Sequence, residues 1–160
     1  MTRYTPDTDM AASFAELSAS AARNRLFSQK AKAEKKTQTA LLLSAMAESE
    51  EIMARRALMA LRGKISDLDD YMEEIADAKA QADDRFERRS RKAREKQEDG
   101  LAEAYERFGA VSRNNGERLA AAAGAAFYVC QVCGYIAADE APERCPVCNA
   151  VSKKFRAHNL

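Results

Sequence analysis

Apolar and small residues recur at helical spacing through the first 120 positions of the chain, and this pattern predicts long helices. No proline occurs between about Asp9 and Ala123, and glycine occurs there only at positions 63, 100, 109 and 116. We predict four helices, over about 9–34, 37–62, 66–97 and 101–121. Helices of this length with short joints pack as a bundle.

The expected helix ends carry ordinary signals. Thr37 is a candidate N-cap for the second helix, and Gly63 is its expected stop. The third helix is expected to begin near Ser66, where the sequence SDLD places acidic residues in the first turn. The fourth helix is expected to follow Gly100.

The pattern changes after the stretch LAAAAGAA at 119–126. Residues 127–160 contain all four cysteines, two of the three prolines and the short β-like pieces FYVC and YIAA. A module this small cannot build a core without a staple. We therefore predict two domains, a helical bundle at 1–123 and a metal-binding β module at 124–160.

The charge of the chain is nearly balanced, with 26 basic and 25 acidic residues. This balance argues against a global field that attracts nucleic acid or a membrane surface. The N-terminal ten residues carry no secretion signal, and the longest apolar run, TALLLSAMA, is too short to span a bilayer. We expect a cytoplasmic protein, in which paired cysteines are metal ligands rather than disulfides.

The four cysteines form two Cys-x-x-Cys pairs with eleven residues between them, at Cys130, Cys133, Cys145 and Cys148. Thiolates at this spacing can converge tetrahedrally on one ion. Gly134 and Asn149 follow the two pairs, where a positive φ is often needed. The alternative is four free cysteines that pack as small apolar side chains. Sulfur ligation of this kind suits zinc and iron equally.

The sequence YVCQVCGYI, followed by CPVCN and Phe155, resembles the short rubredoxin-type iron domain at the C-terminus of rubrerythrins. The resemblance implies one iron held by the four cysteines and cycling between ferric and ferrous states. It also implies shielding of that iron by Tyr128, Tyr135, Ile136 and Phe155. The residues alone leave open a zinc ribbon whose role is to fold the module.

Two helical stretches, at 21–36 and 47–58, resemble the first two helix signatures of rubrerythrins. The resemblance implies a mainly α fold, a ferritin-like four-helix bundle followed by the rubredoxin-like module. It also implies a homodimer, in which helix pairs are often swapped. The joint at 62–66 is too short for a ferritin-like crossover at about 3.3 Å per extended residue. A swap between chains, a third helix that starts near Met72 and a simple up-down bundle are the alternatives.

A rubrerythrin bundle holds two irons with carboxylates and histidines, and most of those ligands are missing here. The resemblance places the expected ligand positions at Ala19, Glu50, Met53, Gln81, Asp84, Asn115 and Arg118. Only Glu50 and Asp84 remain as candidate ligands, because the chain's one histidine is His158, which is expected to be solvated. An all-carboxylate site that adds Glu16 and Glu87 is the alternative.

Glu50 lies on an apolar stripe of the second helix, together with Leu43, Met46, Met53 and Ala57. An unpaired buried carboxylate is costly, so Glu50 needs a partner. We expect Arg118, at a former ligand position, to pair with Glu50 and Asp84.

The Arg/Lys cluster at 85–96 is interpreted as a solvated helix face, and docking of an acidic redox partner is the alternative. The chain as a whole is predicted to be a rubrerythrin-like electron-transfer protein in the oxidative-stress response, without a normal di-iron peroxidase site. The alternatives are a structural or interaction protein with a zinc ribbon, and a peroxidase with an all-carboxylate di-iron site. The family resemblance implies an oxidoreductase, whereas the missing ligands argue against peroxidase activity in the bundle.

Overall fold

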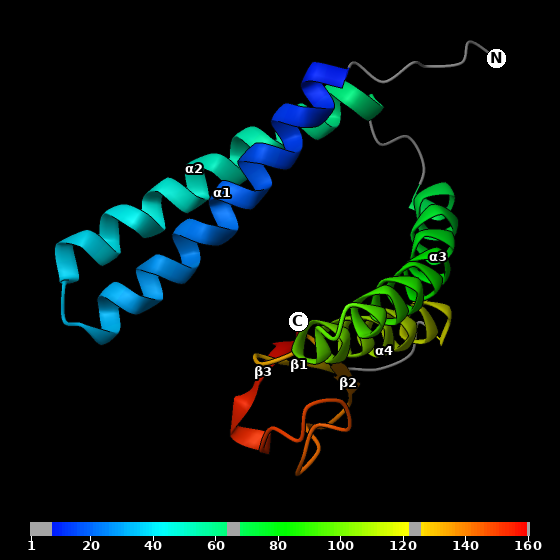
Figure 1. The fold of residues 1–160 in the computed structure, drawn as a ribbon. Coiled ribbons are helices and arrows are strands. Elements are labelled where there is room, and N and C mark those ends of the chain that lie inside the picture. The colour runs from blue at the N-terminus through cyan, green and yellow to red at the C-terminus, as the bar shows by residue number, and fades with distance from the viewer. Residues whose placement is uncertain (1–7, 64–67, 122–125, 160) are drawn as a thin grey trace. The chain divides into compact units, whose positions relative to one another are not determined.

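The computed structural model of the chain describes residues 8–63, 68–121 and 126–159. It contains four long helices followed by a three-stranded sheet (Figure 1). The predicted fold class is confirmed by this order of elements. The chain divides into two compact units, Met1–Ser66 and Asp67–Leu160. Two predicted boundaries, the domain boundary at 123/124 and the helix start at Ser66, lie outside the described residues.

The first unit is a pair of helices, α1 (Thr8–Ala33) and α2 (Thr37–Arg62), whose seam is made of small side chains. On α2, Ala40, Ala47 and Ala54 are buried at intervals of seven residues, which keeps them on one face of the helix. The Ser28 hydroxyl of α1 donates to the Ala40 carbonyl at 2.8 Å, so the side chain of one helix reaches the backbone of the other. The buried residues of the seam are Ala21, Asn24, Ser28, Ala31, Ala40, Ala47, Ala54 and Ala57.

This seam differs from the apolar stripe predicted for the second helix. Met46 and Met53 of that stripe are 43% and 44% exposed, and only Ala57 is buried. The reason is steric: alanines let two helices approach closely, and larger side chains then lie on the flanks of the contact. Several large apolar side chains are therefore exposed on this unit, among them Leu26, Phe27, Leu41, Leu42 and Met59.

The turn after α1 closes the helix with a Schellman-type pattern. The Lys36 N–H donates to the Ala31 carbonyl at 2.9 Å, and Lys35 has a positive φ of 59°. The turn after the third helix repeats this pattern, with Gln97 at the position of positive φ. Glycine is the usual residue at such a position, so neither turn has its strongest sequence signal.

The second unit begins with the helix pair α3 (Leu68–Glu95) and α4 (Asp99–Ala121). The expected start of the fourth helix after Gly100 is wrong, because the chain turns at Gln97 and Gly100 already lies inside α4. Gly109 permits a close approach of the two helices, since a Cβ there would meet Asp83 Oδ1 at 2.9 Å. Three rings of this pair cluster with centroids 5.6–6.3 Å apart, those of Phe86, Tyr105 and Phe108.

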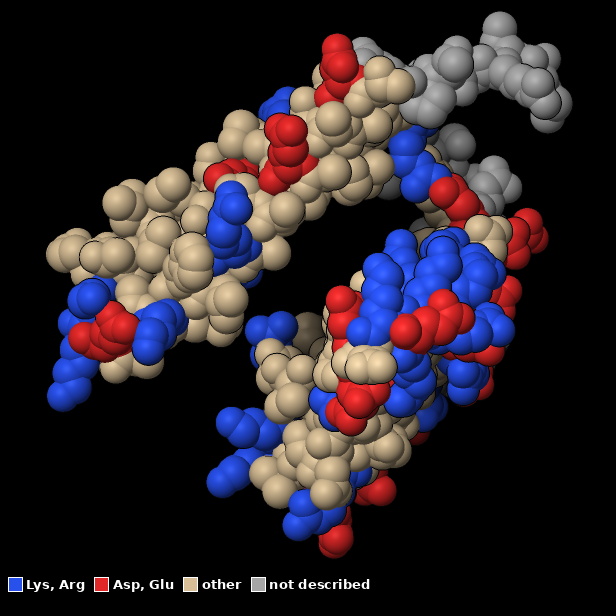
Figure 2. Space-filling model, in the orientation of Figure 1, with Lys and Arg blue, Asp and Glu red and all other residues tan. Residues whose placement is uncertain are grey.

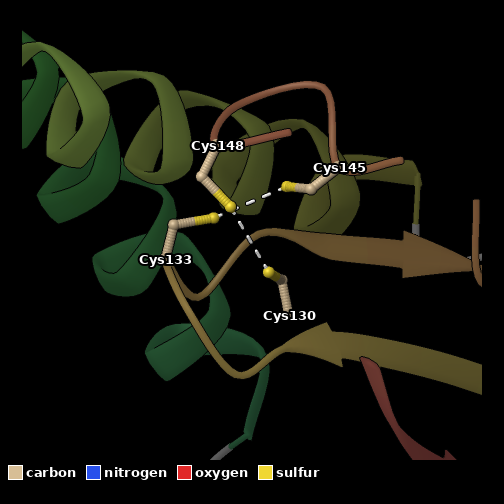
Figure 3. Close-up of side chains that lie close together, drawn as sticks. All are labelled: Cys130, Cys133, Cys145 and Cys148. Carbon is tan, nitrogen blue, oxygen red and sulfur yellow. Dashed lines mark hydrogen bonds between the residues drawn. The ribbon is translucent and has the colours of Figure 1, made fainter. Parts of the chain in front are cut away.

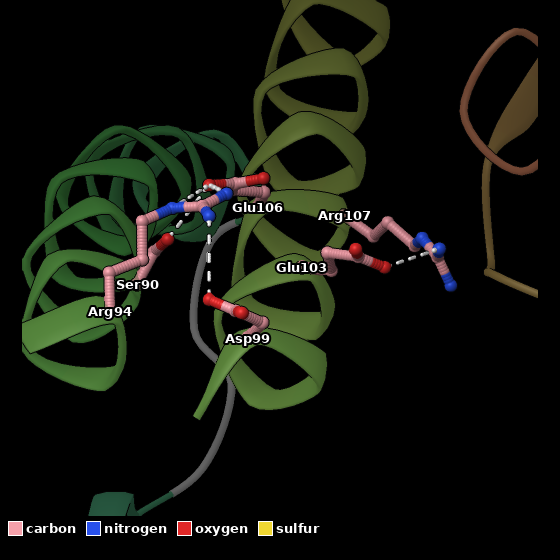
Figure 4. A network of polar contacts seen from close by, with 6 residues as sticks. All are labelled: Ser90, Arg94, Asp99, Glu103, Glu106 and Arg107. Atoms are coloured by element: carbon pink, nitrogen blue, oxygen red, sulfur yellow. Dashed lines mark hydrogen bonds and ion pairs between the residues drawn. The ribbon is translucent and has the colours of Figure 1, made fainter. Parts of the chain in front are cut away.

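A polar network ties α3 to α4 near their turn (Figure 4). The Arg94 guanidinium contacts Glu106 Oε1 at 2.6 Å, and the Ser90 hydroxyl donates to the same oxygen at 3.0 Å. These donors, Arg94 first, hold the pKa of the Glu106 carboxyl below its ordinary value. Because the charged groups of this network are exposed, it contributes more to the alignment of the two helices than to their stability.

The basic cluster at 85–96 lies on α3. Its basic side chains are exposed, and Figure 2 shows Lys and Arg with acidic side chains among them on this unit. Arg94 is paired with Glu106, and the Arg89 guanidinium carbon lies 5.8 Å from the centroid of the Phe86 ring. These contacts agree with a solvated helix face, and docking of an acidic partner stays a prediction.

The second unit ends in a small antiparallel sheet with strand order β2-β1-β3. Its strands are β1 (Ala126–Cys130), β2 (Ile136–Ala138) and β3 (Phe155–Asn159), and a short 3₁₀ helix (Ser152–Lys154) precedes the last strand. Cys130 ends the central strand and pairs with Phe155, so the sheet fixes the backbone of the first cysteine. None of the four described helices has the length and apolar character that crossing a bilayer requires.

Candidate metal centre

The two Cys-x-x-Cys pairs fold into two matching turns. In the first, the Gly134 N–H donates to the Cys130 carbonyl at 2.9 Å, and in the second the Asn149 N–H donates to the Cys145 carbonyl at 2.8 Å. Gly134 and Asn149 have φ angles of 85° and 60°, which confirms the positive φ predicted for both positions. Each turn brings its two cysteine side chains to the same side of the backbone.

The four sulfur atoms lie within 4.8 Å of one another, and Figure 3 shows them converging on one point. The Sγ atoms of Cys130 and Cys148 are 3.7 Å apart, and those of Cys133 and Cys145 are 3.6 Å apart. A tetrahedron with metal–sulfur bonds of about 2.3 Å has edges of about 3.8 Å. The residues present therefore fit a tetrahedral zinc or iron ion, with no large rearrangement needed.

Backbone N–H groups point at the sulfurs of this four-cysteine cluster, which we call the clip. Burial opposes ionisation of Cys130, but the N–H groups of Val132 and Cys133 bring its pKa below the ordinary value. Burial raises the pKa of Cys133. A hydrogen bond from the Tyr135 N–H lowers this pKa, but its effect is smaller than that of burial. Backbone donors thus lower the pKa of the Cys130 thiol, whereas burial keeps the pKa of the Cys133 and Cys148 thiols above the ordinary value. Metal binding displaces the thiol protons that burial retains.

The side chains expected to shield the metal belong to the same module as the clip, and their shielding role stays a prediction. All four are half-buried, and two lie on strands that pair next to the first cysteine. Cys130 and Cys145 are 1% and 2% exposed, whereas Cys133 and Cys148 are half-buried. One side of the clip is therefore closer to solvent than the other. The expected shielding residues are Tyr128, Tyr135, Ile136 and Phe155.

Glu50 lies in the seam of the first unit and is held by two uncharged donors. The Ser20 hydroxyl donates to Oε1 and the Asn24 amide donates to Oε2, each at 2.8 Å. Arg23 in turn contacts the Ser20 hydroxyl at 3.3 Å. Both carboxylate oxygens of Glu50 therefore have partners on α1. Pairing of Glu50 with Arg118 would join the two units, and it stays a prediction.

Asp84 and Arg118 lie apart within the second unit. The helices α3 and α4 run antiparallel, with Gly109 against Asp83 and Gly116 against Lys79. Arg118 therefore lies level with a residue of α3 that precedes Lys79, whereas Asp84 follows Lys79. At 1.5 Å per residue, the two side chains start about 10 Å apart along the helices. Asp84 is exposed and Arg118 is half-buried. The predicted ion pair between them is not present among the described residues of this unit.

Other expected ligand positions are occupied by residues that lie mostly on the surface. Ala19, Met53 and Gln81 are exposed, and Asn115 is half-buried. Glu16 lines one shallow hollow with Glu50, while Glu87 is exposed on α3. His158 is exposed in β3. Among the described residues within either unit, the clip is the one group of three or more potential ligands placed to share an ion.

Three residues with specific contacts were missed by the sequence reasoning. Ser20 and Asn24 bind Glu50, and Asn114 of α4 donates to the Ile136 carbonyl at 3.1 Å. The interval of seven between Ala40, Ala47 and Ala54 could have predicted which face of α2 packs against α1. That face, in turn, could have directed the search for partners of Glu50 to polar residues of α1. No comparable signal in the sequence connects Asn114 with a strand 22 residues later.

Comparison with known proteins supports these assignments. The family described as rubrerythrin, rubredoxin-like domain, matches residues 128–156. Solved structures of nigerythrin, in its fully reduced (all ferrous), mixed-valence and partially reduced states, each match with a TM-score of 0.56 and 22% identity. Each match covers 94% of this chain and 85% of the nigerythrin chain. No curated protein sequence matches significantly.

Nigerythrin is a rubrerythrin-family protein, and at 22% identity the likeness of the helices is one of fold. The sequence match is confined to the module that holds the four cysteines. Taken with the four-cysteine clip, these findings show a rubredoxin-like domain of the rubrerythrin type at residues 128–156, and a fold over most of the chain that is similar to that of nigerythrin.

Proposed function

We propose that this chain carries single electrons on one iron held by the clip. The observation that carries the proposal is the convergence of four cysteine sulfurs within 4.8 Å in a rubredoxin-like module. Iron in four thiolates changes its charge by one without changing its ligands. The solved structures of nigerythrin, described in all-ferrous, mixed-valence and partially reduced states, support redox chemistry in a protein of this fold.

Spectroscopy of the iron-loaded full chain tests this function. We expect a red protein whose visible bands bleach on addition of one electron per clip and return on reoxidation. A chain that accepts no electron when iron is bound contradicts the proposal. A colourless native protein with zinc in the clip supports the alternative, a structural or interaction protein whose zinc ribbon only folds the module.

We further propose that the helical part has no normal di-iron peroxidase site. The support is the chemistry of the donor set: Glu50 is engaged by Ser20 and Asn24, and alanine and methionine stand at Ala19 and Met53. Such residues do not fit a site that needs carboxylates and histidines on four helices. We expect the iron-loaded chain to turn over hydrogen peroxide no faster than a matched variant with Glu50→Gln. Turnover that requires Glu50 would favour the all-carboxylate alternative.

The biological setting that the family suggests is a response to oxidative stress in the cytoplasm, with a protein as the electron donor or acceptor. A cell that lacks this chain should then be more sensitive to peroxide or oxygen. Unchanged sensitivity, with the chain normally expressed, contradicts this part of the proposal.

We also propose that the chain forms a homodimer, with helix pairs exchanged between two copies. The support is the set of large apolar side chains exposed on both units, such as Leu42 at 62%, Met59 at 56% and Phe108 at 50%. Contact with a second copy would remove these side chains from water. Light scattering on the full chain should give twice the mass of 17.7 kDa. A stable monomer at micromolar concentration contradicts the dimer.

A further inference from the structure

The side chains of Asn114 and Val111 on helix α4 contact the metal-binding module. The Asn114 amide donates to the Ile136 carbonyl of β2 at 3.1 Å. Val111, about one turn earlier on the same helix, lies against the first cysteine turn: its Cγ1 is 3.8 Å from the place where a Cβ at Gly134 would be. In the view of Figure 3 the ribbon of α4 runs behind the turns that carry the cysteines.

Both contacts fall on the segment that shapes the first half of the clip. Gly134 follows Cys133 directly, and Ile136 pairs with Val129, the residue before Cys130. The Cys130 N–H donates to the carbonyl of Tyr135, which lies between the two contact points. Helix α4 therefore braces the loop that carries Cys130 and Cys133, rather than a remote edge of the sheet.

The chemistry of Asn114 suits a docking role. Its side chain is half-buried, and its amide nitrogen is also 3.4 Å from Asn115 Oδ1, so it has one partner on its own helix and one on the module. The Ile136 carbonyl loses its side-chain donor if the module leaves α4. Such a half-buried polar contact has a defined geometry, so it favours one seating of the module on the helix.

We propose that α4 forms one wall of the metal centre, and that Asn114 is the positioning residue that seats the clip on it. The first cysteine turn cannot spread open to release the metal while it is seated. The wall also keeps water from the Gly134 side of the sulfurs, and solvent exposure is one of the factors that set the potential of a thiolate-bound metal. The seating is independent of the metal's identity, whereas its redox consequence rests on the proposed electron-transfer function.

Zinc release from the full chain tests the seating, because zinc needs no redox function. With an excess of a coloured chelator, Asn114→Ala should release zinc roughly fivefold faster than the unchanged chain, the factor expected for loss of one hydrogen bond. Val111→Ala should shift the rate in the same direction. The matched control is Asn115→Ala, which removes the same side chain one residue along α4 and should change the rate by less than about twofold.

Equal release rates for Asn114→Ala and Asn115→Ala overturn the seating. If Asn114→Ala alters the helical circular dichroism, Asn114→Asp provides the same test, since it keeps the shape of the side chain and removes the amide donor. This experiment remains decisive even if the clip carries no electrons, so its failure is distinct from failure of the proposed function.

The reduction potential of the iron-loaded chain tests the wall. The reduced clip carries one more negative charge than the oxidised clip, and water stabilises that extra charge. Opening the wall with Asn114→Ala should therefore shift the potential upward, while Asn115→Ala leaves it unchanged. Identical potentials in the two variants overturn the role of α4 as a wall of the centre.

Discussion

The clip and the α1/α2 pair are organised in opposite ways. In the clip, four side chains within a stretch of 19 residues converge on one point, at a spacing that fits a tetrahedral metal ion. In the α1/α2 pair, small side chains along two helices of 26 residues each make a buried seam, and the half-buried carboxylate of Glu50 is held by neutral donors beside it. The two regions therefore differ in what stabilises them. The C-terminal module is too small for a core of its own and depends on a metal site, whereas the long helices are held together by close packing of small side chains.

The largest expected effect is removal of one ligand from the clip. Cys145→Ser should abolish stable metal binding and unfold the module, because structural metal sites contribute on the order of 10 kcal/mol to folding. The α1/α2 pair should keep its helical circular dichroism. Metal content after gel filtration and the far-ultraviolet spectrum are the measurements. Loss of most helical signal together with the metal would show that the two regions depend on each other.

The next effect is overpacking of the alanine seam. Ala47 is fully buried, so Ala47→Leu should destabilise the α1/α2 pair by about 1–3 kcal/mol without changing the metal content. Ala45→Leu, at a less buried position of the same helix, is the control and should change stability by less than about 0.5 kcal/mol. Urea unfolding followed by circular dichroism measures both. Similar stability of the two variants would contradict the seam.

Replacement of Glu50 separates a structural carboxylate from a metal ligand. Glu50→Ala leaves the Ser20 hydroxyl and the Asn24 amide without their acceptor, and it should cost about 1–2 kcal/mol of folding free energy. The metal content should not change. Glu51→Ala, which removes a neighbouring exposed carboxylate, should cost less. A fall in bound iron in Glu50→Ala would instead identify a ligand in the bundle.

The smallest effect is the pH dependence of the exposed ion pair between Arg25 and Glu51. The Arg25 hydrogen bond holds the pKa of Glu51 below its ordinary value of 4.5. A carboxyl with a lowered folded-state pKa stabilises the fold above its ordinary pKa, and this contribution is lost as the pH falls through the folded-state value. Glu51→Gln should therefore lower the melting temperature slightly near neutral pH and have no effect in strong acid. A difference that grows in acid would contradict the assignment.

The sequence was most informative where the structure depends on neighbours along the chain. Cysteine spacing, together with Gly134 and Asn149, was enough to predict both turns of the clip, since each turn is closed by residues within the same five positions. The presence of four helices was also predictable, because the first 120 positions have helical spacing of apolar and small residues and contain no proline after Pro6. The ends of α1 and α3 were harder to predict, because the residues with positive φ in the turns that follow them are Lys35 and Gln97 rather than glycine.

Contacts between distant segments were the part that the sequence did not reveal. Met46 and Met53 were expected in the core because of their apolar character, yet the register of α1 against α2 selects the alanines instead. The partners of Glu50 depend on that register, and so they could not be identified from α2 alone. Asn114 depends on how a sheet sits against a helix, and no local pattern encodes this.

The metal content of the protein isolated from its native cell, grown with ample iron, tests the central claim most directly. We predict one iron per chain, bound by the four cysteines of the clip, and no iron bound by the helices. The visible bands of the protein should bleach on reduction. Zinc as the sole native metal would contradict the electron-transfer role, and about three irons per chain would contradict the absence of a di-iron site.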